Sequence, residues 1–324
     1  MIQKGTILQN LTNCIEDTSF LNIQGMKKGK VRDTYDLGDK LMLITTDRQS
    51  AFDRVLACIP FKGQVLNQVS AFWFENTRHI VQNHLIATPD PNITIAKKCT
   101  VFPVEFVVRG YLTGSTSTSA WTLYSKGERT ICGNRMPDGM KKNQKFEKPI
   151  LTPTTKSDLH DESISAREIV SRKLIDEATW KKLEAIVFAL FEFGTKTAEK
   201  HGLILVDTKY ELGLDSDGNI LLIDEIHTPD SSRYWLSASY EERLEKNMEP
   251  ENIDKEFLRL WFRDHCDPYK DAVLPKAPDD LIAELSYRYI TLYEMITGLD
   301  FSTDASINIR ERMTNNLIKA GYMK

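Results

Sequence analysis

The chain has 324 residues, of which 41% are hydrophobic and 27% are charged, and this ordinary composition excludes a long disordered segment. A formal net charge of -4 excludes a generally basic surface for nucleic acid or acidic lipid, so any anion site must be local. No apolar run reaches the ~20 residues of a membrane span, the N-terminus lacks a signal-peptide core, and the cysteines form no CxxC motif. We therefore expect a cytoplasmic protein with reduced thiols and with neither a membrane nor a nucleic-acid partner.

The first third of the chain is rich in predicted strands. Residues 31–36 and 41–46 read as two strands joined by the turn LGDK. Apolar residues at helical spacing then predict a helix within 63–80. The segment VFPVEFVVRG, residues 101–110, predicts a short buried strand.

The rest of the chain shifts from strands to helices. The polar stretch 134–164 predicts an ordered loop over a surface or cleft, and Ser165 with Glu168 fits a capping box at the start of a helix. An apolar stripe predicts a second helix from Asp176 to Lys200. A hairpin of two strands follows, and the last eighty residues read mainly as helices. Together the elements indicate an α+β or mixed α/β fold.

The hairpin carries the strongest chemical signal. Alternation along its first strand puts Asp207, Lys209 and Glu211 on one face. With a two-residue turn at Asp217-Gly218, Glu211 lies opposite Asp224, with roughly 5 Å between their β-carbons, which destabilises a sheet unless a cation lies between them. Mg²⁺ is typically held by one or two carboxylates and phosphate oxygens, so the pattern indicates a nucleotide–metal site. A solvated face, where each acid has its own lysine, is the equal alternative.

Each of three other polar stretches can be interpreted in two ways, as a binding site or as a purely structural feature. The segment GMKKGKVRD puts Lys30 in a glycine-rich turn that could lie over phosphates or be a plain basic hairpin. Arg109, ahead of Ser115, could clamp a phosphate or form a structural salt bridge. His160 beside Asp161 could transfer a proton or be a loop residue without chemistry.

Seven segments in this order resemble the SAICAR synthetase (phosphoribosylaminoimidazole-succinocarboxamide synthase) family: GKVRDTYDL, DRQSAFD, IPFKGQVLNQVSAFWF, PVEFVVRGYLTGS, TPTTKSDLHDESIS, LILVDTKYELG and IDEIHTPDSSRYW. TPDSSR preceded by DTKYE is the most specific part. The loop STSTSA, residues 115–120, is longer than the family pattern. His227 stands where a leucine is common, and we expect no catalytic consequence.

The resemblance implies an ATP-grasp-like α+β fold, with two lobes of antiparallel sheets and a helical C-terminal extension. The expected division is an N-terminal ATP-binding lobe (1–107), a C-terminal lobe with the metal hairpin and substrate site (108–240), and a helical extension packed on the C-terminal lobe (241–324). The implied activity is that of an ATP-dependent ligase of de novo purine biosynthesis. It joins L-aspartate to carboxyaminoimidazole ribonucleotide (CAIR) through an acyl phosphate, and we expect a monomer.

The resemblance also implies roles for residues at matching positions. The ATP site comprises Gly29, Lys30, Val31, Arg32, Lys98, Val101 and Glu105. Glu211 and Asp224 would bind Mg²⁺, and the catalytic set is Lys209, Lys30 and Asp207. Arg109, Ser115, Asp230, Ser231 and Arg233 would bind the ribonucleotide. Lys156, Asp158, His160 and Asp161 would border the aspartate site, and no general base for the aspartate amine is assigned.

Two other functions remain possible at this point. A small-molecule kinase would use the same ATP site with an alcohol acceptor, and its phosphate transfer would not require aspartate. A catalytically silent nucleotide sensor would lack a metal ligand or a phosphate-binding lysine. The presence of Lys30, Lys209, Glu211 and Asp224 argues against the sensor.

Overall fold

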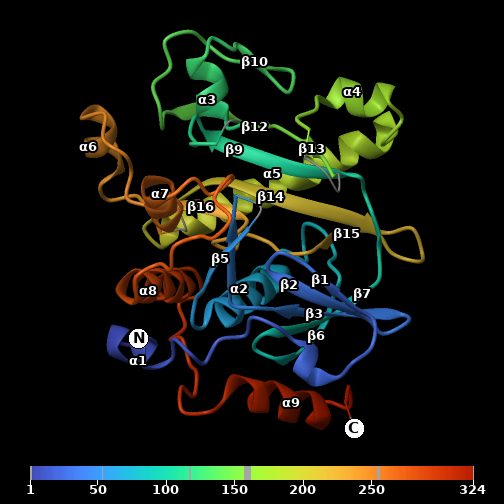
Figure 1. The fold of residues 1–324 in the computed structure, drawn as a ribbon. Coiled ribbons are helices and arrows are strands. Elements are labelled where there is room, and N and C mark those ends of the chain that lie inside the picture. The colour runs from blue at the N-terminus through green and yellow to red at the C-terminus, as the bar shows by residue number, and fades with distance from the viewer. Residues whose placement is uncertain (1, 53, 117, 157–161, 254–255, 324) are drawn as a thin grey trace.

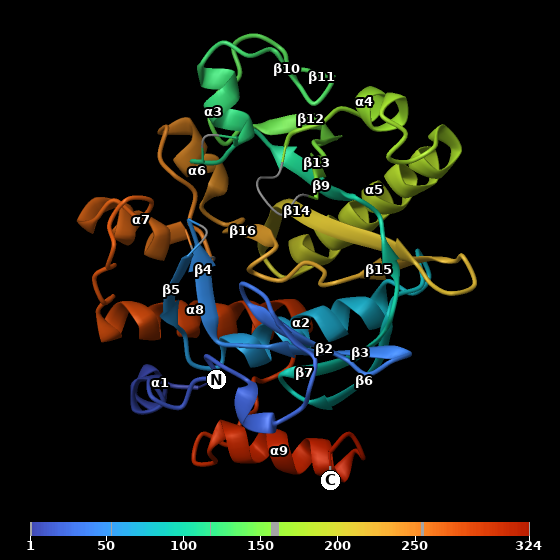
Figure 2. The same cartoon turned by 45° about the vertical axis from the view of Figure 1, so that its right-hand side comes forward.

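A computed structural model gives the structure of the chain and describes residues 2–52, 54–116, 118–156, 162–253 and 256–323. Its centre is formed by two antiparallel sheets in separate layers, surrounded by helices (Figures 1 and 2). The α+β architecture expected from the sequence is confirmed. Among the described residues, no helix combines the length and the apolar character that a membrane crossing requires.

The N-terminal sheet has five strands in the order β1-β2-β3-β7-β6. Their bounds are β1 (Met26–Lys28), β2 (Arg32–Asp36), β3 (Lys40–Thr45), β6 (Leu85–Asp90) and β7 (Ile93–Lys97). A two-stranded ribbon of β4 (Arg48–Ala51) and β5 (Arg54–Cys58) and the helix α2 (Lys62–Asn76) lie between β3 and β6 in the chain. The predicted first hairpin is confirmed, as is the helix within 63–80, which ends at Asn76.

The C-terminal sheet is built around the long strand β14 (Leu203–Leu214). The central order is β12 (Lys145–Leu151), β9 (Val104–Tyr111), β14 and β15 (Ile220–Ile223). In addition, β8 (Thr100–Val101) and β16 (Ser232–Leu236) pair with β14, and β13 (Thr154–Thr155) pairs with β9. Strand β12 corrects the prediction of a loop over 134–164. It carries lysines and a proline, which hid the pattern, yet it pairs with β9 and buries Phe146 and Leu151.

Helix α5 (Glu177–Lys200) packs against β14 and β9 through its apolar stripe. Asp176 caps its start by accepting from the backbone N–H of Thr179, and Gly202 follows its end with a φ of +71°. The short helix α4 (Ala166–Ser171) begins with the predicted capping box, which is confirmed. Helix α3 (Ala120–Ser125) and the small ribbon of β10 (Thr130–Ile131) and β11 (Asn134–Arg135) lie at the far end of this lobe (Figure 1).

The helical extension comprises α6 (Tyr240–Glu245), α7 (Glu256–His265), α8 (Asp279–Thr297) and α9 (Ile309–Lys319). The prediction that it packs on the C-terminal lobe is wrong for its last two helices. Helix α8 packs on α1 (Lys4–Gln9) and α2. Helix α9 lies below the N-terminal sheet in both views, with Met313 and Leu317 in one core cluster with Met42 and Ile44 (Figures 1 and 2).

The three-part division of the chain needs an adjusted boundary. The predicted border at 107/108 falls inside β9, whose hydrogen bonds all lie in the C-terminal sheet. The chain changes sheets between Lys97 and Thr100. One hydrophobic cluster contains residues of α2 in the N-terminal part, of β9 and β14 in the C-terminal part, and of α8 in the extension. We therefore propose that the chain has three parts which share one core.

Candidate active site

The hairpin of β14 and β15 has a different register from the predicted one. Glu211 pairs with Ile223, not with Asp224, because the connection has five residues instead of two. The Asp215 carboxylate causes this, since it accepts from the backbone N–H groups of Asp217 and Asn219 at 3.0 and 2.9 Å and closes a wider turn. Asp224 therefore lies just beyond β15, with a φ of +65°.

The two acids nevertheless meet around one lysine. Lys209 Nζ lies 2.6 Å from Glu211 Oε1, 2.8 Å from Glu105 Oε1 and 4.0 Å from Asp224 Oδ2. Lys209 pairs with Val107 across to β9, and alternation brings Glu105 to the same face. Lys156 Nζ bonds the other oxygen of Glu211. We call Glu105, Lys209, Glu211 and Asp224 the acid–lysine cluster.

Burial and charge compete within this cluster. Burial alone would raise the pKa of Glu211, but Lys209 and Lys156 outweigh it and lower that pKa to about 2. Burial would likewise lower the pKa of Lys209, yet Glu211, Asp224 and Glu105 raise it above its usual value. Glu211 is therefore ionised and Lys209 is charged at neutral pH.

Oxygen donors in this cluster fit Mg²⁺. Hard divalent cations of this kind take carboxylate oxygens and usually complete their shell with phosphate oxygens and water. Glu211 and Asp224 both direct an oxygen toward the same Lys209 ammonium, so the cluster already gathers negative charge around one cation. Within the described ranges no group of three or more His, Cys, Asp or Glu side chains forms an all-protein metal cage.

The glycine–lysine turn connects β1 and β2 and lies beside this cluster. Its Gly29 N–H donates to Arg32 O at 2.8 Å, and a β-carbon at Gly29 would lie 2.4 Å from that oxygen, so only glycine fits. Lys30 is exposed and Val31 is half-buried. The Arg32 guanidinium turns to the second lobe, where it pairs with Asp224 and Glu225.

The remaining residues predicted for nucleotide binding lie along the connection between the two sheets. Lys98 follows β7 and forms a half-exposed ion pair with Asp36 at 2.6 Å. Val101, on β8, is 41% exposed and pairs with Gly213 of β14. Neither side chain reaches the acid–lysine cluster in the interactions of the described residues, whereas Glu105 belongs to it.

A second charged group lies two residues before Lys209 on the same face of β14. Asp207 pairs with Arg109 on β9 and with Arg233 on β16, so the three side chains form one row across three strands. Asp207 Oδ2 lies 3.2 Å from Arg109 Nη1 and 2.5 Å from Arg233 Nη1. Two guanidinium groups share one carboxylate, which leaves a net positive row suited to an anion such as a phosphate.

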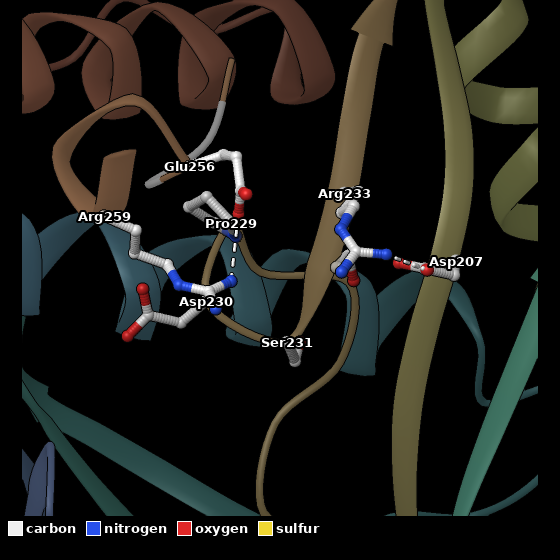
Figure 3. A pocket seen from close by; sticks show the side chains of 8 residues that line it. Asp207, Pro229, Asp230, Ser231, Arg233, Glu256 and Arg259 are labelled. Carbon is white, nitrogen blue, oxygen red and sulfur yellow. Dashed lines mark hydrogen bonds and ion pairs between the residues drawn. The ribbon is translucent and has the colours of Figure 1, made fainter. Parts of the chain in front are cut away.

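Asp207 and Arg233 line a cavity of about 130 Å³, whose walls include Pro229, Asp230, Ser231, Ser232, Glu256 and Arg259. Figure 3 shows Arg233 turned to Asp207 and Arg259 paired with Glu256, whose Oε2 lies 2.9 Å from Arg259 Nη1. Ser115 donates to Glu256 Oε1 at 2.5 Å. Glu256 and Arg259 come from α7 and were missed, because an amphipathic helix in an extension gives no sign that it reaches a site.

Asp230 is held by two residues that the sequence also did not single out. Its Oδ2 lies 2.7 Å from Lys62 Nζ, and its Oδ1 accepts from Tyr289 Oη at 2.7 Å. Lys62 has no exposed side-chain surface and Asp230 only 6%. A lysine in the largely apolar segment IPFKGQV was a possible signal, because such a lysine needs a buried carboxylate partner.

The predicted aspartate-binding stretch is described only in part. Lys156 belongs to the surroundings of Glu211, as noted above. Asp158, His160 and Asp161 lie outside the described residues. Ser231, predicted for the ribonucleotide, lies in the loop before β16, where its carbonyl accepts from Lys209 N at 3.0 Å.

His227 belongs to the connection between β15 and β16, and its side chain is completely buried. Its Nε2 lies 2.6 Å from the Tyr210 hydroxyl, and its ring meets Trp73 edge-on at 4.7 Å between centroids. Burial lowers its pKa to about 3. Tyr210 faces the opposite side of β14 from Lys209, so His227 is a core residue, and its ring makes no contact with the acid–lysine cluster among the described interactions.

Comparisons with known proteins agree on one family. The family model described as SAICAR synthetase matches residues 25–276. Phosphoribosylaminoimidazole-succinocarboxamide synthase of Legionella pneumophila (strain Paris) is 60% identical over 305 residues, which cover 94% of this chain and 97% of the relative. The chloroplastic synthase of Arabidopsis thaliana is 62% identical over 298 residues, covering 91% of this chain and 72% of the relative.

Solved structures give the same result for the fold. The SAICAR synthase of Saccharomyces cerevisiae in complex with SAICAR superimposes with a TM-score of 0.77 at 32% identity, covering 89% of this chain and 100% of that one. A type-2 SAICAR synthetase in complex with ADP gives a TM-score of 0.65 at 26% identity, with 86% and 100% covered.

Proposed function

The chain belongs to the SAICAR synthetase family, and from this premise we propose how its residues divide the work of the reaction. It is an ATP-dependent ligase of purine biosynthesis that joins L-aspartate to CAIR, giving SAICAR, ADP and phosphate. The CAIR carboxylate is a poor electrophile. ATP converts it to an acyl phosphate, and the aspartate amine then forms the amide as phosphate leaves.

One observation carries the residue assignment. A single face of β14 presents Asp207, Lys209 and Glu211 in sequence, and these residues belong to two different charge arrangements, Asp207 to one and Lys209 with Glu211 to the other. The first arrangement is positive through Arg109 and Arg233, and the second gathers carboxylates around a lysine. An anionic ribonucleotide beside a metal-bound triphosphate needs this succession of charges.

The acid–lysine cluster would handle the triphosphate. Glu211 and Asp224 would hold Mg²⁺, which when bound neutralises phosphate charge. Lys209 is charged and held by Glu105 and Glu211, so it is placed to stabilise the phosphoryl group that moves to the CAIR carboxylate. Gly29, Lys30 and Val31 would cover the phosphates from the other lobe, while Lys98 and Val101 would border the nucleoside.

The arginine row would hold the ribonucleotide phosphate. Arg109 and Arg233 offer planar donor groups, and Asp207 fixes both guanidinium planes before substrate arrives. Arg259 lines the same cavity and adds a third guanidinium, and Ser231 contributes a hydroxyl. Asp230 would act mainly through position, because its two oxygens bind Lys62 and Tyr289.

Catalysis in this proposal rests on positioning and charge. The reaction needs no enzyme nucleophile, since the aspartate amine attacks the acyl phosphate itself. Lys156, Asp158, His160 and Asp161 remain proposed for the aspartate site, and the monomeric state and cytoplasmic location remain predictions.

Phosphate release with each substrate omitted in turn tests this function. We expect release only when ATP, CAIR and Mg²⁺ are present, with L-aspartate needed for continued turnover. Steady phosphate release from ATP and CAIR without aspartate, at the full rate, would favour hydrolysis of ATP instead of ligation. Steady ADP formation without phosphate release would favour a kinase. As a control, D-aspartate has the same charge as the substrate with its amine differently placed, and it should not sustain turnover.

A further inference from the structure

The motif DRQSAFD contributes a buried arginine that none of the assigned roles uses. Arg48 opens β4 and is 1% exposed, and its ion-pair partner Asp33 on β2 is 0% exposed, with Nη2 2.7 Å from Oδ1. Thr18 Oγ1 donates to the other Asp33 oxygen at 2.7 Å. The pair thus lies inside the N-terminal lobe, beneath the glycine–lysine turn.

All three side-chain nitrogens of Arg48 donate to backbone carbonyls. Nη2 donates to Gly29 O at 3.0 Å, Nε to Lys30 O at 3.2 Å and Nη1 to Glu16 O at 2.6 Å. Two of these carbonyls belong to the turn between β1 and β2. An arginine fork satisfies several acceptors with one rigid group, so it fixes their directions relative to each other.

The neighbouring residue extends this arrangement. Val31 O accepts from both the backbone N–H of Thr46, at 3.0 Å, and its hydroxyl, at 2.5 Å. Three successive carbonyls, those of residues 29, 30 and 31, are therefore bound by the segment 46–48. The turn is also closed by the Gly29 N–H to Arg32 O bond. Its peptide groups consequently have little freedom to rotate.

We propose that Arg48 is a positioning residue for ATP, which holds the carbonyls of the turn inward so that the turn presents its cationic and N–H side to the phosphates. This inference rests on the proposed function of the turn as a phosphate cover. Arg48 itself touches no substrate and acts through Gly29 and Lys30. Anion binding by backbone groups depends on their common direction, so a turn free to rotate would bind phosphate more weakly.

Arg48→Lys is the informative variant. Lysine keeps the charge opposite Asp33, which avoids an unpaired buried carboxylate, but one ammonium cannot reach Gly29 O, Lys30 O and Glu16 O together. We expect about a tenfold or greater rise in the KM for ATP, with the KM values for CAIR and aspartate changed less than about twofold.

Arg312→Lys is the matched control. Arg312 also forms a fork, with Nε 3.1 Å and Nη2 3.2 Å from the Asp90 carboxylate, but it ties α9 to β6 instead of holding the turn. If Arg48 has only a structural role, both variants should lose stability and leave the ratio of the three KM values unchanged. That outcome would overturn the inference.

Calorimetric measurement of adenosine, ADP and ATP binding tests the role of Arg48 separately from the proposed role of the turn as a phosphate cover. The loss of affinity in Arg48→Lys should grow from adenosine to ATP, and an equal loss for all three contradicts the proposal. Lys30→Ala provides the second arm. If Lys30→Ala leaves ATP affinity intact, the turn does not cover phosphates and the assignment of the turn fails. If Lys30→Ala weakens ATP binding and Arg48→Lys does not, only the role of Arg48 fails.

Discussion

Replacing His227 by leucine and Tyr210 by phenylalanine together tests how the core behind the site depends on pH. His227 has no exposed surface, and its Nε2 is 2.6 Å from the Tyr210 hydroxyl. Burial lowers its pKa to about 3, against a model-peptide value near 6.5 in an unfolded chain. The double change removes both polar partners, since His227→Leu alone would leave the Tyr210 hydroxyl buried without a partner.

The sign follows from proton binding. Between the two pKa values the unfolded chain binds a proton at this histidine and the native protein does not, so acid favours unfolding. The contribution is therefore fully present above the unfolded pKa and is lost as the pH falls toward 3. From about pH 7.5 to about pH 5 it amounts to about 2 kcal/mol of unfolding free energy.

Urea denaturation of the wild type and of the double variant, over this pH range, measures the effect. His84, which is also buried with a lowered pKa, is present in both proteins and cancels in the difference. We expect the difference between the two unfolding free energies to change by about 2 kcal/mol in favour of the variant on acidification. If the unfolding free energies of the two proteins changed in parallel with pH, the pKa of His227 would be the same in the folded and the unfolded chain, and the argument would be refuted. Tyr210→Phe alone should keep the wild-type slope.

Two further substitutions test the packing and the arginine row. Gly194→Ala should destabilise the protein, because its β-carbon would lie 2.4 Å from His227 Cε1, and overpacking costs roughly 1–3 kcal/mol against a helix-propensity gain of about 1 kcal/mol. Gly5→Ala, with nothing within 4 Å, should be neutral or stabilising in the same denaturation experiment, and equal effects would refute the packing argument. Arg233→Ala should raise the KM for CAIR roughly ten- to hundredfold and that for ATP much less, as steady-state kinetics would reveal, since a contact to a charged group contributes about 1.5–3 kcal/mol. An unchanged KM for CAIR would place its phosphate elsewhere.

The charged face of β14 was predictable because side-chain alternation depends only on local backbone geometry. The register of its hairpin was not, because Asp215 closes the turn with its side chain and competes with the tight Asp217-Gly218 turn. The meeting of Glu211 and Asp224 around Lys209 survives this change. Asp224 lies just beyond the end of β15 and has a positive φ, so the direction of its side chain does not follow from the pairing of the strands.

Contacts between segments far apart in the sequence are the second feature that could not be predicted from the sequence. The last eighty residues were predicted to be mainly helical, but a helical pattern does not identify what a helix packs on, and α8 and α9 pack on α2 and on the N-terminal sheet. Lys62 and Tyr289 were missed for the same reason. Each meets Asp230 only because α2, α8 and the loop before β16 come together in the folded chain.

Binding of Mn²⁺ together with a non-hydrolysable ATP analogue, followed by electron paramagnetic resonance, tests the central assignment most directly. The wild type should bind the metal–nucleotide complex, and Glu211→Gln and Asp224→Asn should each weaken that binding by about tenfold or more while the far-UV circular dichroism stays unchanged. Wild-type affinity for the metal–nucleotide complex in both variants would contradict the account.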